Sequence, residues 1–245
     1  SKSFGGINAV DDISFSVAVG EMLAMIGPNG AGKSTCFNML MGQLKPTAGK
    51  IFLAEQNIVG LTPRRIWRLG VGRTFQITAT YPSMTVAENV QMALISDRGR
   101  IFSSLSLASG LFRDEAVELL RLVGMGQQAG RHAAVLAYGD VKRLELAIAI
   151  ANKPKLLLMD EPTAGMGPRE RADLMQLTAD IVAERNISAL FTEHDMDVVF
   201  THADRVIVLN RGELIANGSV DEVRDNLQVQ EIYLGGGTLY ASEGA

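Results

Sequence analysis

The segment Gly27-Pro28-Asn29-Gly30-Ala31-Gly32-Lys33-Ser34-Thr35 follows the apolar run 22–26 and leads into residues 36–41. It predicts a phosphate loop, in which glycines turn backbone N–H groups inward and a new helix points its positive end at an anion. Lys33 then reaches the β- and γ-phosphates of a nucleotide, and the Ser34 hydroxyl is placed to ligate Mg²⁺. A glycine-rich turn before an ordinary helix is the alternative. Kinases, GTPases and transport ATPases share this loop, so it does not identify the protein.

Length and composition fit one large α/β domain or a core with a smaller subdomain. The chain has 245 residues, 47% of them hydrophobic, which is enough to bury a full core. The net charge is −4 and the basic residues are scattered, so no nucleic-acid partner is expected. No apolar run reaches the roughly 18 residues that would span a membrane. The first residues, 1–6, lack the apolar core of a signal peptide, which favours the cytosol.

Strand-like and helix-like segments alternate along most of the chain. We expect strands at 13–17, 22–26, 51–53, 71–76, 156–159, 187–192 and 205–209, with a hairpin at 210–213. We expect helices at 63–69, 85–94, 113–123, 140–151 and 168–184, and one more from residue 195. Residues 78–150 carry no strong strand signal, and 96–110 is a Ser- and Gly-rich connection that we expect to be mobile. The fold class is therefore α/β, a mostly parallel sheet with antiparallel β strands and an inserted α-helical subdomain.

Polar residues follow three of the expected strands. Asp160 and Glu161 end the apolar run 156–159, where Asp160 is placed to hold Mg²⁺ and Glu161 to polarise the water that attacks the γ-phosphate. His194 follows the strand 187–192 and is interpreted as a γ-phosphate sensor or a partner of the general base. Gln76 ends another strand, and its amide is placed to touch Mg²⁺ or the water. A polar strand end at Asp160 and a structural histidine at His194 are the alternatives.

The single cysteine, Cys36, excludes an internal disulfide and a cysteine-based metal site. Its position just after the phosphate loop raises the idea of a redox sensor. A small apolar side chain that faces the sheet is the favoured interpretation.

In order along the chain, these motifs resemble those of ABC transporter ATP-binding subunits, and the match covers essentially the whole sequence. The resemblance identifies Walker A at 27–34, Gln76, a signature loop at Leu136-Ala137-Tyr138-Gly139-Asp140, Walker B at 156–161 and His194. It implies a P-loop NTPase (RecA-like) core at 1–77 and 152–245 and a helical signature subdomain at 78–151. It also implies two ATP molecules between two subunits, each facing one phosphate loop and the other subunit's signature loop. Taken alone, Asp140 could be no more than a helix cap.

The sequence departs from the family pattern L-S-G-G-Q at three positions of the signature loop. Ala137 lacks the hydroxyl expected to bond the γ-phosphate, Tyr138 replaces a glycine, and Asp140 replaces a glutamine. The segment 164–167 lacks the aspartate usual after Walker B, so crosstalk between the two ATP sites is expected to use backbone groups. Phe4 best matches the aromatic residue that stacks on adenine.

Four short segments resemble sequences of the branched-chain amino-acid uptake group: residues 72–76, 84–90, 162–166 and 232–235. Relative to that group, a short strand usually found before Ser3 is expected to be missing. The resemblance implies an ATP hydrolase on the cytoplasmic face of the membrane, which binds ATP and Mg²⁺ and works with membrane-spanning permease subunits. A second ATP-binding subunit, identical or a sister, and indirectly an extracytoplasmic solute-binding protein are the other partners. The loop 77–84 is the candidate contact with the permease.

The interpretation is an ATP-binding subunit of an importer for branched-chain or similar amino acids. Three alternatives stay open: a non-transport ABC-type ATPase, an importer of another small solute such as an amide or aromatic acid, and a soluble P-loop kinase. The first would resemble chains with coiled-coil inserts or two ATPase units, and neither occurs here. A kinase would phosphorylate an acceptor and stay monomeric with ATP.

Overall fold

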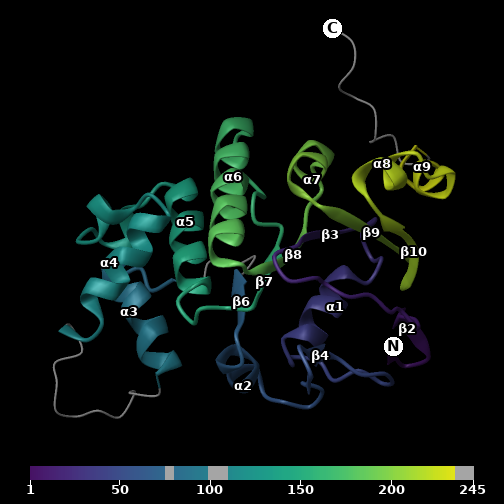
Figure 1. Cartoon of the computed structure of the whole chain (residues 1–245), viewed down its shortest axis with the longest axis horizontal. Helices are drawn as coiled ribbons and strands as arrows, with labels where there is room; N and C mark the ends of the chain where they lie inside the picture. The colour runs from purple at the N-terminus through teal and green to yellow at the C-terminus, as the bar shows by residue number, and fades with distance from the viewer. Residues whose placement is uncertain (75–79, 99–109, 235–245) are drawn as a thin grey trace, which may run out of the picture. The chain divides into compact units, whose positions relative to one another are not determined.

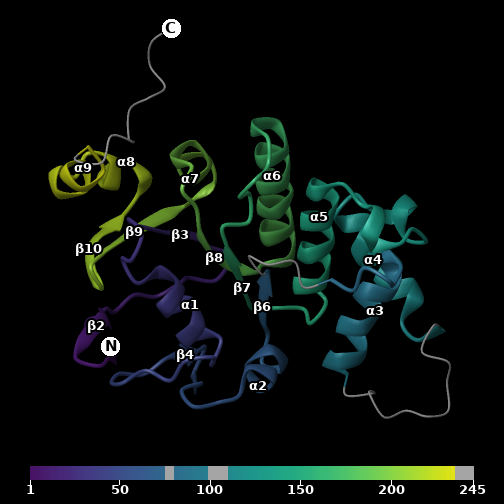
Figure 2. The same ribbon diagram turned by 180° about the vertical axis from the view of Figure 1, so that it is seen from behind.

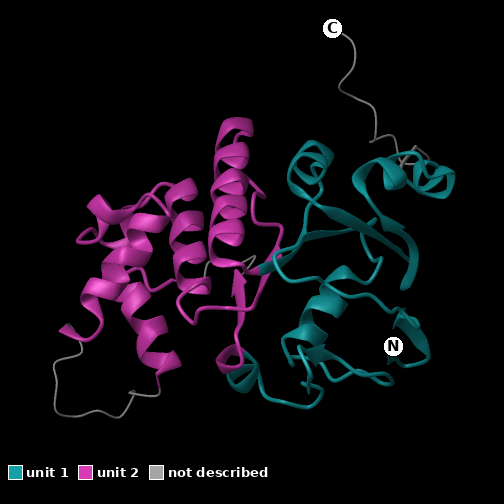
Figure 3. Ribbon diagram, in the orientation of Figure 1, with its two compact units in different colours: residues 1–66, 188–245 teal, residues 67–187 magenta. Residues whose placement is uncertain are grey.

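A computed structural model describes residues 1–74, 80–98 and 110–234, and the chain divides into two compact units (Figure 3). Unit 1 is Ser1–Ile66 with Ser188–Ala245, and unit 2 is Trp67–Ile187. These boundaries lie at other points than 77 and 152, so the division into core and helical subdomain stays a prediction. None of the described helices is long and apolar enough to cross a membrane.

Unit 1 contains the strand that leads into the phosphate loop. This strand, β3 (Met22–Ile26), pairs in parallel with β8 (Ser188–Thr192) and with β9 (Arg205–Asn210). The last strand, β10 (Glu213–Gly218), runs antiparallel to β9 through the expected hairpin (Figure 1). Every residue of β3 and β8 is buried, as is typical of central parallel strands covered on both faces.

Two small hairpins and several helices complete unit 1. The hairpins are β1 (Lys2–Phe4) with β2 (Ile7–Val10), and β4 (Phe52–Leu53) with β5 (Gln56–Asn57). The helices are α1 (Lys33–Leu40), α7 (Met196–His202), α8 (Val220–Arg224) and α9 (Leu227–Leu234); α2 (Pro63–Arg68) crosses into unit 2. One expected strand, 13–17, is wrong. Its residues alternate between half-buried and exposed, but none is paired in a ladder, and the Ser16 carbonyl accepts from the Arg205 guanidinium instead.

Unit 2 contains the strands that lead to Gln76 and to Asp160. They are β6 (Val71–Thr74) and β7 (Leu156–Asp160), which pair in parallel. Between them the described residues form the helices α3 (Val86–Asp97), α4 (Arg113–Leu122) and α5 (Tyr138–Ala149), and the short 3₁₀ turns η2 (Gly126–Gln128) and η3 (Ala133–Val135). The long helix α6 (Pro168–Arg185) follows β7. Both views show α3, α4 and α5 side by side (Figures 1 and 2).

Helix starts follow the sequence signals closely. The expected capping box is present at α3, where the Thr85 hydroxyl accepts from the Glu88 N–H and the Glu88 carboxylate accepts from the Thr85 N–H. Helix α5 begins at Tyr138 rather than at Asp140, so the signature loop supplies the first turn of the helix. Most of the expected connection 96–110 lies outside the described residues.

Candidate functional site

The phosphate loop in unit 1 has a backbone that only glycine fits at two positions. A Cβ on Gly27 would lie 2.1 Å from the Leu209 carbonyl oxygen, and one on Gly32 would lie 2.5 Å from the Ala9 carbonyl oxygen. Gly32 also has a φ of +107°, in the left-handed region. The loop is further tied to the β9–β10 turn, since the Gly212 N–H donates to the Ala31 carbonyl over 3.0 Å.

Lys33 and Ser34 stand in the first turn of α1, directly after this loop. The Lys33 ammonium donates to the carbonyls of Gly27, over 2.5 Å, and of Pro28, over 3.2 Å, so its side chain folds back across the loop. The N-cap residue Gly32 supplies no side-chain hydrogen bond, and no acidic residue lies in the first turn. The N-cap residue therefore caps none of the first amide groups of α1, and such a helix start suits an anion.

His194 follows the strand beside the one that carries the phosphate loop. The register pairs Ala24 of β3 with Phe191 of β8, and the two parallel strands then lead to Gly27 and to His194. The imidazole is exposed, while Asp195 caps α7 by accepting from the N–H groups of residues 197 and 198. Phe4, in β1 of the same unit, is 47% exposed with the Lys2 ammonium 4.9 Å from its ring centre.

Asp160 in unit 2 is paired with an arginine that sequence reasoning did not single out as a site residue. The Arg73 guanidinium lies 3.5 Å from the Asp160 carboxylate, and both side chains are almost fully buried. Burial lowers the pKa of Arg73 from its ordinary value, and the charge of Asp160 opposes that shift. In the sequence, Arg73 stands out only as part of the segment 72–76, which resembles the branched-chain uptake group. Gln76, two residues beyond β6, lies outside the described residues.

Glu161 begins a tight turn immediately after β7. Its φ is +50°, a left-handed conformation that costs a residue with a side chain about 1–2 kcal/mol. The Ala164 N–H donates to the Glu161 carbonyl over 3.2 Å, and the Met166 N–H donates to the Thr163 carbonyl over 3.1 Å. Two successive turns therefore hold the backbone on which the Glu161 carboxylate stands.

The signature loop forms the start of α5, also in unit 2. Ala137 is the N-cap and provides no side-chain hydrogen bond, as the missing hydroxyl predicted. The Tyr138 hydroxyl donates to the Ala164 carbonyl over 2.9 Å, and the Gln128 amide donates to the Asp140 carboxylate over 3.0 Å. Leu136 is half-buried just before the cap, and a Cβ on Gly139 would lie 3.5 Å from the Glu170 carboxylate. Side chains thus hold this loop.

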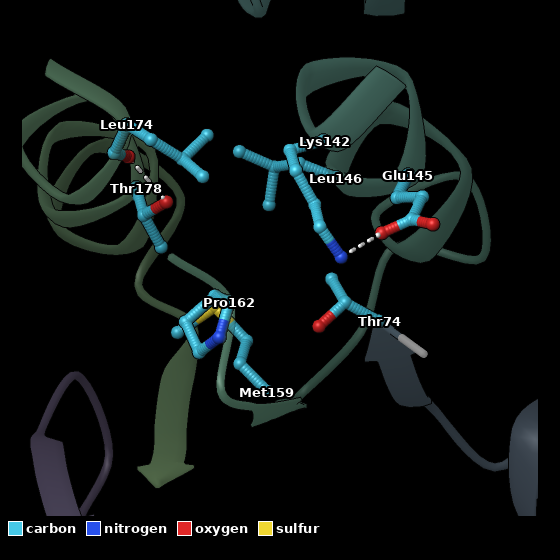
Figure 4. A pocket seen from close by; sticks show the side chains of 8 residues that line it. All are labelled: Thr74, Lys142, Glu145, Leu146, Met159, Pro162, Leu174 and Thr178. Atoms are coloured by element: carbon cyan, nitrogen blue, oxygen red, sulfur yellow. Dashed lines mark hydrogen bonds and ion pairs between the residues drawn. The ribbon is translucent and has the colours of Figure 1, made fainter. Parts of the chain in front are cut away.

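A small, mostly apolar cavity of about 10 Å³ lies within unit 2, lined by side chains of β6, α5, β7 and α6 (Figure 4). Lys142 and Glu145 of α5 form an ion pair of 3.1 Å there, and both side chains are 4% exposed. Thr74, the last residue of β6, lines the same cavity, and in Figure 4 its hydroxyl points away from the Lys142 ammonium. The same ammonium lies 5.5 Å from the centre of the Tyr138 ring. Sequence periodicity placed Glu145 on a helix but gave no sign of this buried pair.

A phosphate loop between a buried parallel strand and a helix, with carboxylates that end another parallel strand, defines a P-loop nucleotide-binding protein. Residues 10–164 match the family model described as ABC transporter, and residues 213–238 match the model described as branched-chain amino acid ATP-binding cassette transporter. The chain therefore belongs to the ABC transporter family, whose ATP-binding cassettes are ATP-hydrolysing transport ATPases. The kinase alternative is thereby wrong.

One relative is the high-affinity branched-chain amino acid transport ATP-binding protein LivG of Salmonella typhimurium. It is 41% identical over 240 residues, which cover 95% of this chain and 94% of LivG. A crystal structure of an ABC transporter cassette in its ADP conformation gives a TM-score of 0.84 at 30% identity and covers 96% of this chain and 95% of that one. A dimeric cassette bound to ADP and Pi gives a TM-score of 0.74 at 26% identity, covering 87% of this chain and 91% of that one.

Proposed function

We propose that this chain is the ATP-binding subunit of an importer that takes up branched-chain amino acids. The observation that carries the proposal is the match of residues 213–238 to the branched-chain model, outside the part shared by all such cassettes. The identity to LivG over nearly the whole of both chains supports the same substrate class. ATP hydrolysis in this chain then drives transport through separate membrane-spanning permease subunits.

ATP binding is assigned to the loop 27–35 and the exposed ring of Phe4. The inward N–H groups and Lys33 hold the phosphates, and Phe4 stacks on the adenine. The Ser34 hydroxyl, the Asp160 carboxylate and the Gln76 amide are oxygen ligands of the kind Mg²⁺ prefers. Bound Mg²⁺ would neutralise charge on the β- and γ-phosphates.

Hydrolysis is assigned to Glu161 and His194 of one subunit and to the signature loop of another. The Glu161 carboxylate orients the attacking water, and His194 contacts the γ-phosphate. The start of α5, Leu136–Asp140, then faces the γ-phosphate bound to a second ATP-binding subunit, where the uncapped amides of the helix meet the anion. In this arrangement 78–151 acts as the helical signature subdomain, and 1–77 with 152–245 acts as the RecA-like core.

The permease contact is assigned to the loop 77–84, at the cytoplasmic face of the membrane. Tyr81 is 52% exposed, yet its backbone N–H donates to Asn89 over 2.7 Å and its carbonyl accepts from the same side chain over 3.1 Å. Asn89 thus fixes the Tyr81 backbone to α3, while the exposed Tyr81 ring is available to a partner. We expect Tyr81→Ala to uncouple transport and spare ATP hydrolysis. Equal loss of both activities would contradict this role.

The substrate class is tested by uptake of radiolabelled leucine, isoleucine and valine in cells that lack this chain. Expression of the wild-type chain should restore uptake, and Glu161→Gln, which replaces the carboxylate by an amide of the same shape, should not. Restored uptake of an amide or an aromatic acid, with no effect on these three amino acids, would replace the proposed substrate.

The nucleotide-driven pairing is tested by light scattering of Glu161→Gln with and without ATP and Mg²⁺. ATP should convert monomer to dimer, because ATP binds two surfaces at once in the closed pair and slow hydrolysis preserves it. A monomer that binds ATP but never pairs would show that a sister subunit is required.

A further inference from the structure

Tyr138 connects the signature loop to the turn that follows Walker B in the same chain. Its hydroxyl donates to the Ala164 carbonyl over 2.9 Å. Its ring lies against Gly165, where an added Cβ would be 3.5 Å from the ring. Both contacts lie within unit 2, and they join residues far apart in the sequence. The glycine usual at this position of the family could make neither contact.

Ala164 is itself bonded to Glu161. The Ala164 N–H donates to the Glu161 carbonyl over 3.2 Å, while the Ala164 carbonyl accepts from Tyr138. Two hydrogen bonds therefore lead from the Tyr138 hydroxyl to the backbone of Glu161. Glu161 has a φ of +50°, and such a conformation persists only where its surroundings hold it.

We propose that Tyr138 is a positioning residue for Glu161, acting through the backbone of the turn 161–164. The inference rests on the proposed function, in which Glu161 orients the water that attacks ATP. A carboxylate misplaced by a fraction of an ångström orients water poorly, so loss of the tether slows the chemical step. It leaves the binding of ATP to this chain's own phosphate loop unchanged, because neither hydrogen bond of the tether involves residues 27–35. The start of α5, which faces the partner's ATP, is in this way connected to the chain's own general base.

The test is Tyr138→Phe, which keeps the ring and removes only the hydroxyl. We expect kcat for ATP hydrolysis to fall about fivefold, the rate equivalent of one ordinary hydrogen bond, with KM for ATP unchanged. Tyr138→Gly, which restores the usual family residue, should be at least as slow. Thr178→Val is the matched control: it removes a hydroxyl that donates to the Leu174 carbonyl in α6, over 2.7 Å, and should keep the wild-type kcat.

A second measurement separates this role from a contact with the partner's nucleotide. In the Glu161→Gln background, where slow hydrolysis preserves the ATP-bound pair, Tyr138→Phe should leave the ATP concentration for half-maximal dimerisation unchanged. An unchanged kcat in Tyr138→Phe overturns the inference, and so does a shift in that ATP concentration. If the wild-type chain binds and hydrolyses no ATP at all, the proposed function fails instead, a result that the wild-type protein alone reveals.

Discussion

Two helix starts in this molecule, those of α1 and α5, are both assigned to bind a phosphate group, yet they are built differently. Neither has a side-chain cap: Gly32 stands before α1 and Ala137 before α5. By contrast, Thr85 and Ser219 cap α3 and α8 with complete capping boxes. The absence of an N-cap side chain is not confined to these two, since Phe112 before α4 gives none either; at α1 and α5 the lack of a cap suits the phosphates assigned to them.

The two starts differ in what holds them. Before α1, close backbone contacts hold the loop, because neither Gly27 nor Gly32 has room for a Cβ. At α5, side chains hold the loop through Tyr138 and Asp140. In a loop held by close backbone contacts, one added atom should cause a large loss of stability. In a loop held by side chains, removing one side-chain group should have a smaller effect. The following predictions test that difference.

The largest effect is expected for Gly27→Ala. The new Cβ would lie 2.1 Å from the Leu209 carbonyl oxygen, so the loop or β9 must move. We expect the free energy of unfolding to fall by at least about 4 kcal/mol, measured by urea titration. Gly60→Ala is the control, since Gly60 has a similarly disfavoured φ of +81° but no atom within 4 Å of the new Cβ. It should cost only about 1 kcal/mol, and equal losses would contradict the steric explanation.

Next in size is Arg73→Met, which removes a buried side-chain contact of unit 2 where Gly27→Ala disturbs a close backbone contact. It removes the buried guanidinium 3.5 Å from Asp160 and leaves a carboxylate in a nearly dry place. Breaking such a pair by removing one partner should lower the free energy of unfolding by about 3 kcal/mol. Arg121→Met is the control, because its salt bridge with Glu118 is exposed. That change should cost at most about 0.5 kcal/mol by the same titration; a similar loss in both variants would refute the effect of burial.

The backbone-held region was predictable from sequence, and the reason is physical. A phosphate loop is set by glycine spacing, and β3 and β7 are apolar runs with abrupt polar ends, so local sequence alone determines both. The prediction failed at 13–17, where alternation was present but no strand partner was. Period-two alternation shows that one face of a segment is more buried than the other. Whether the segment pairs with a neighbouring strand depends on tertiary structure.

The side-chain contacts of unit 2 could not be predicted in the same way. Arg73 meets Asp160, and Tyr138 meets Ala164, only because the fold brings distant segments together. Tyr138 was noted as a departure from the family glycine, but nothing local indicated its partner. The roles of Gln76, Glu161 and His194 stay predictions that only the functional tests can decide.

A smaller effect is expected for Asp140→Asn. Asp140 places a negative charge in the first turn of α5, where it favours the helix but repels the phosphate assigned to that position. In the Glu161→Gln background, the ATP concentration for half-maximal dimerisation should fall about two- to fivefold, the range of a solvent-screened charge interaction. Asp114→Asn, in the first turn of α4, is the control and should leave that concentration unchanged. A higher ATP requirement in Asp140→Asn would show that the carboxylate helps pairing.

The last test needs no mutation. The rate at which the Cys36 thiol, one turn into α1, reacts with a labelling reagent reports whether the backbone-held start of this helix opens locally. Cys36 is 3% exposed, and burial raises its pKa to about 12. Because a raised pKa leaves less thiolate at any given pH, reaction with an aromatic disulfide at pH 8 should be at least about 100-fold slower than in the unfolded chain. Labelling should therefore follow unfolding across a urea titration, as it would if α1 opened only with the rest of unit 1. Rapid labelling of the native protein, with the urea midpoint unchanged, would show that α1 opens locally and that close backbone contacts do not keep it closed.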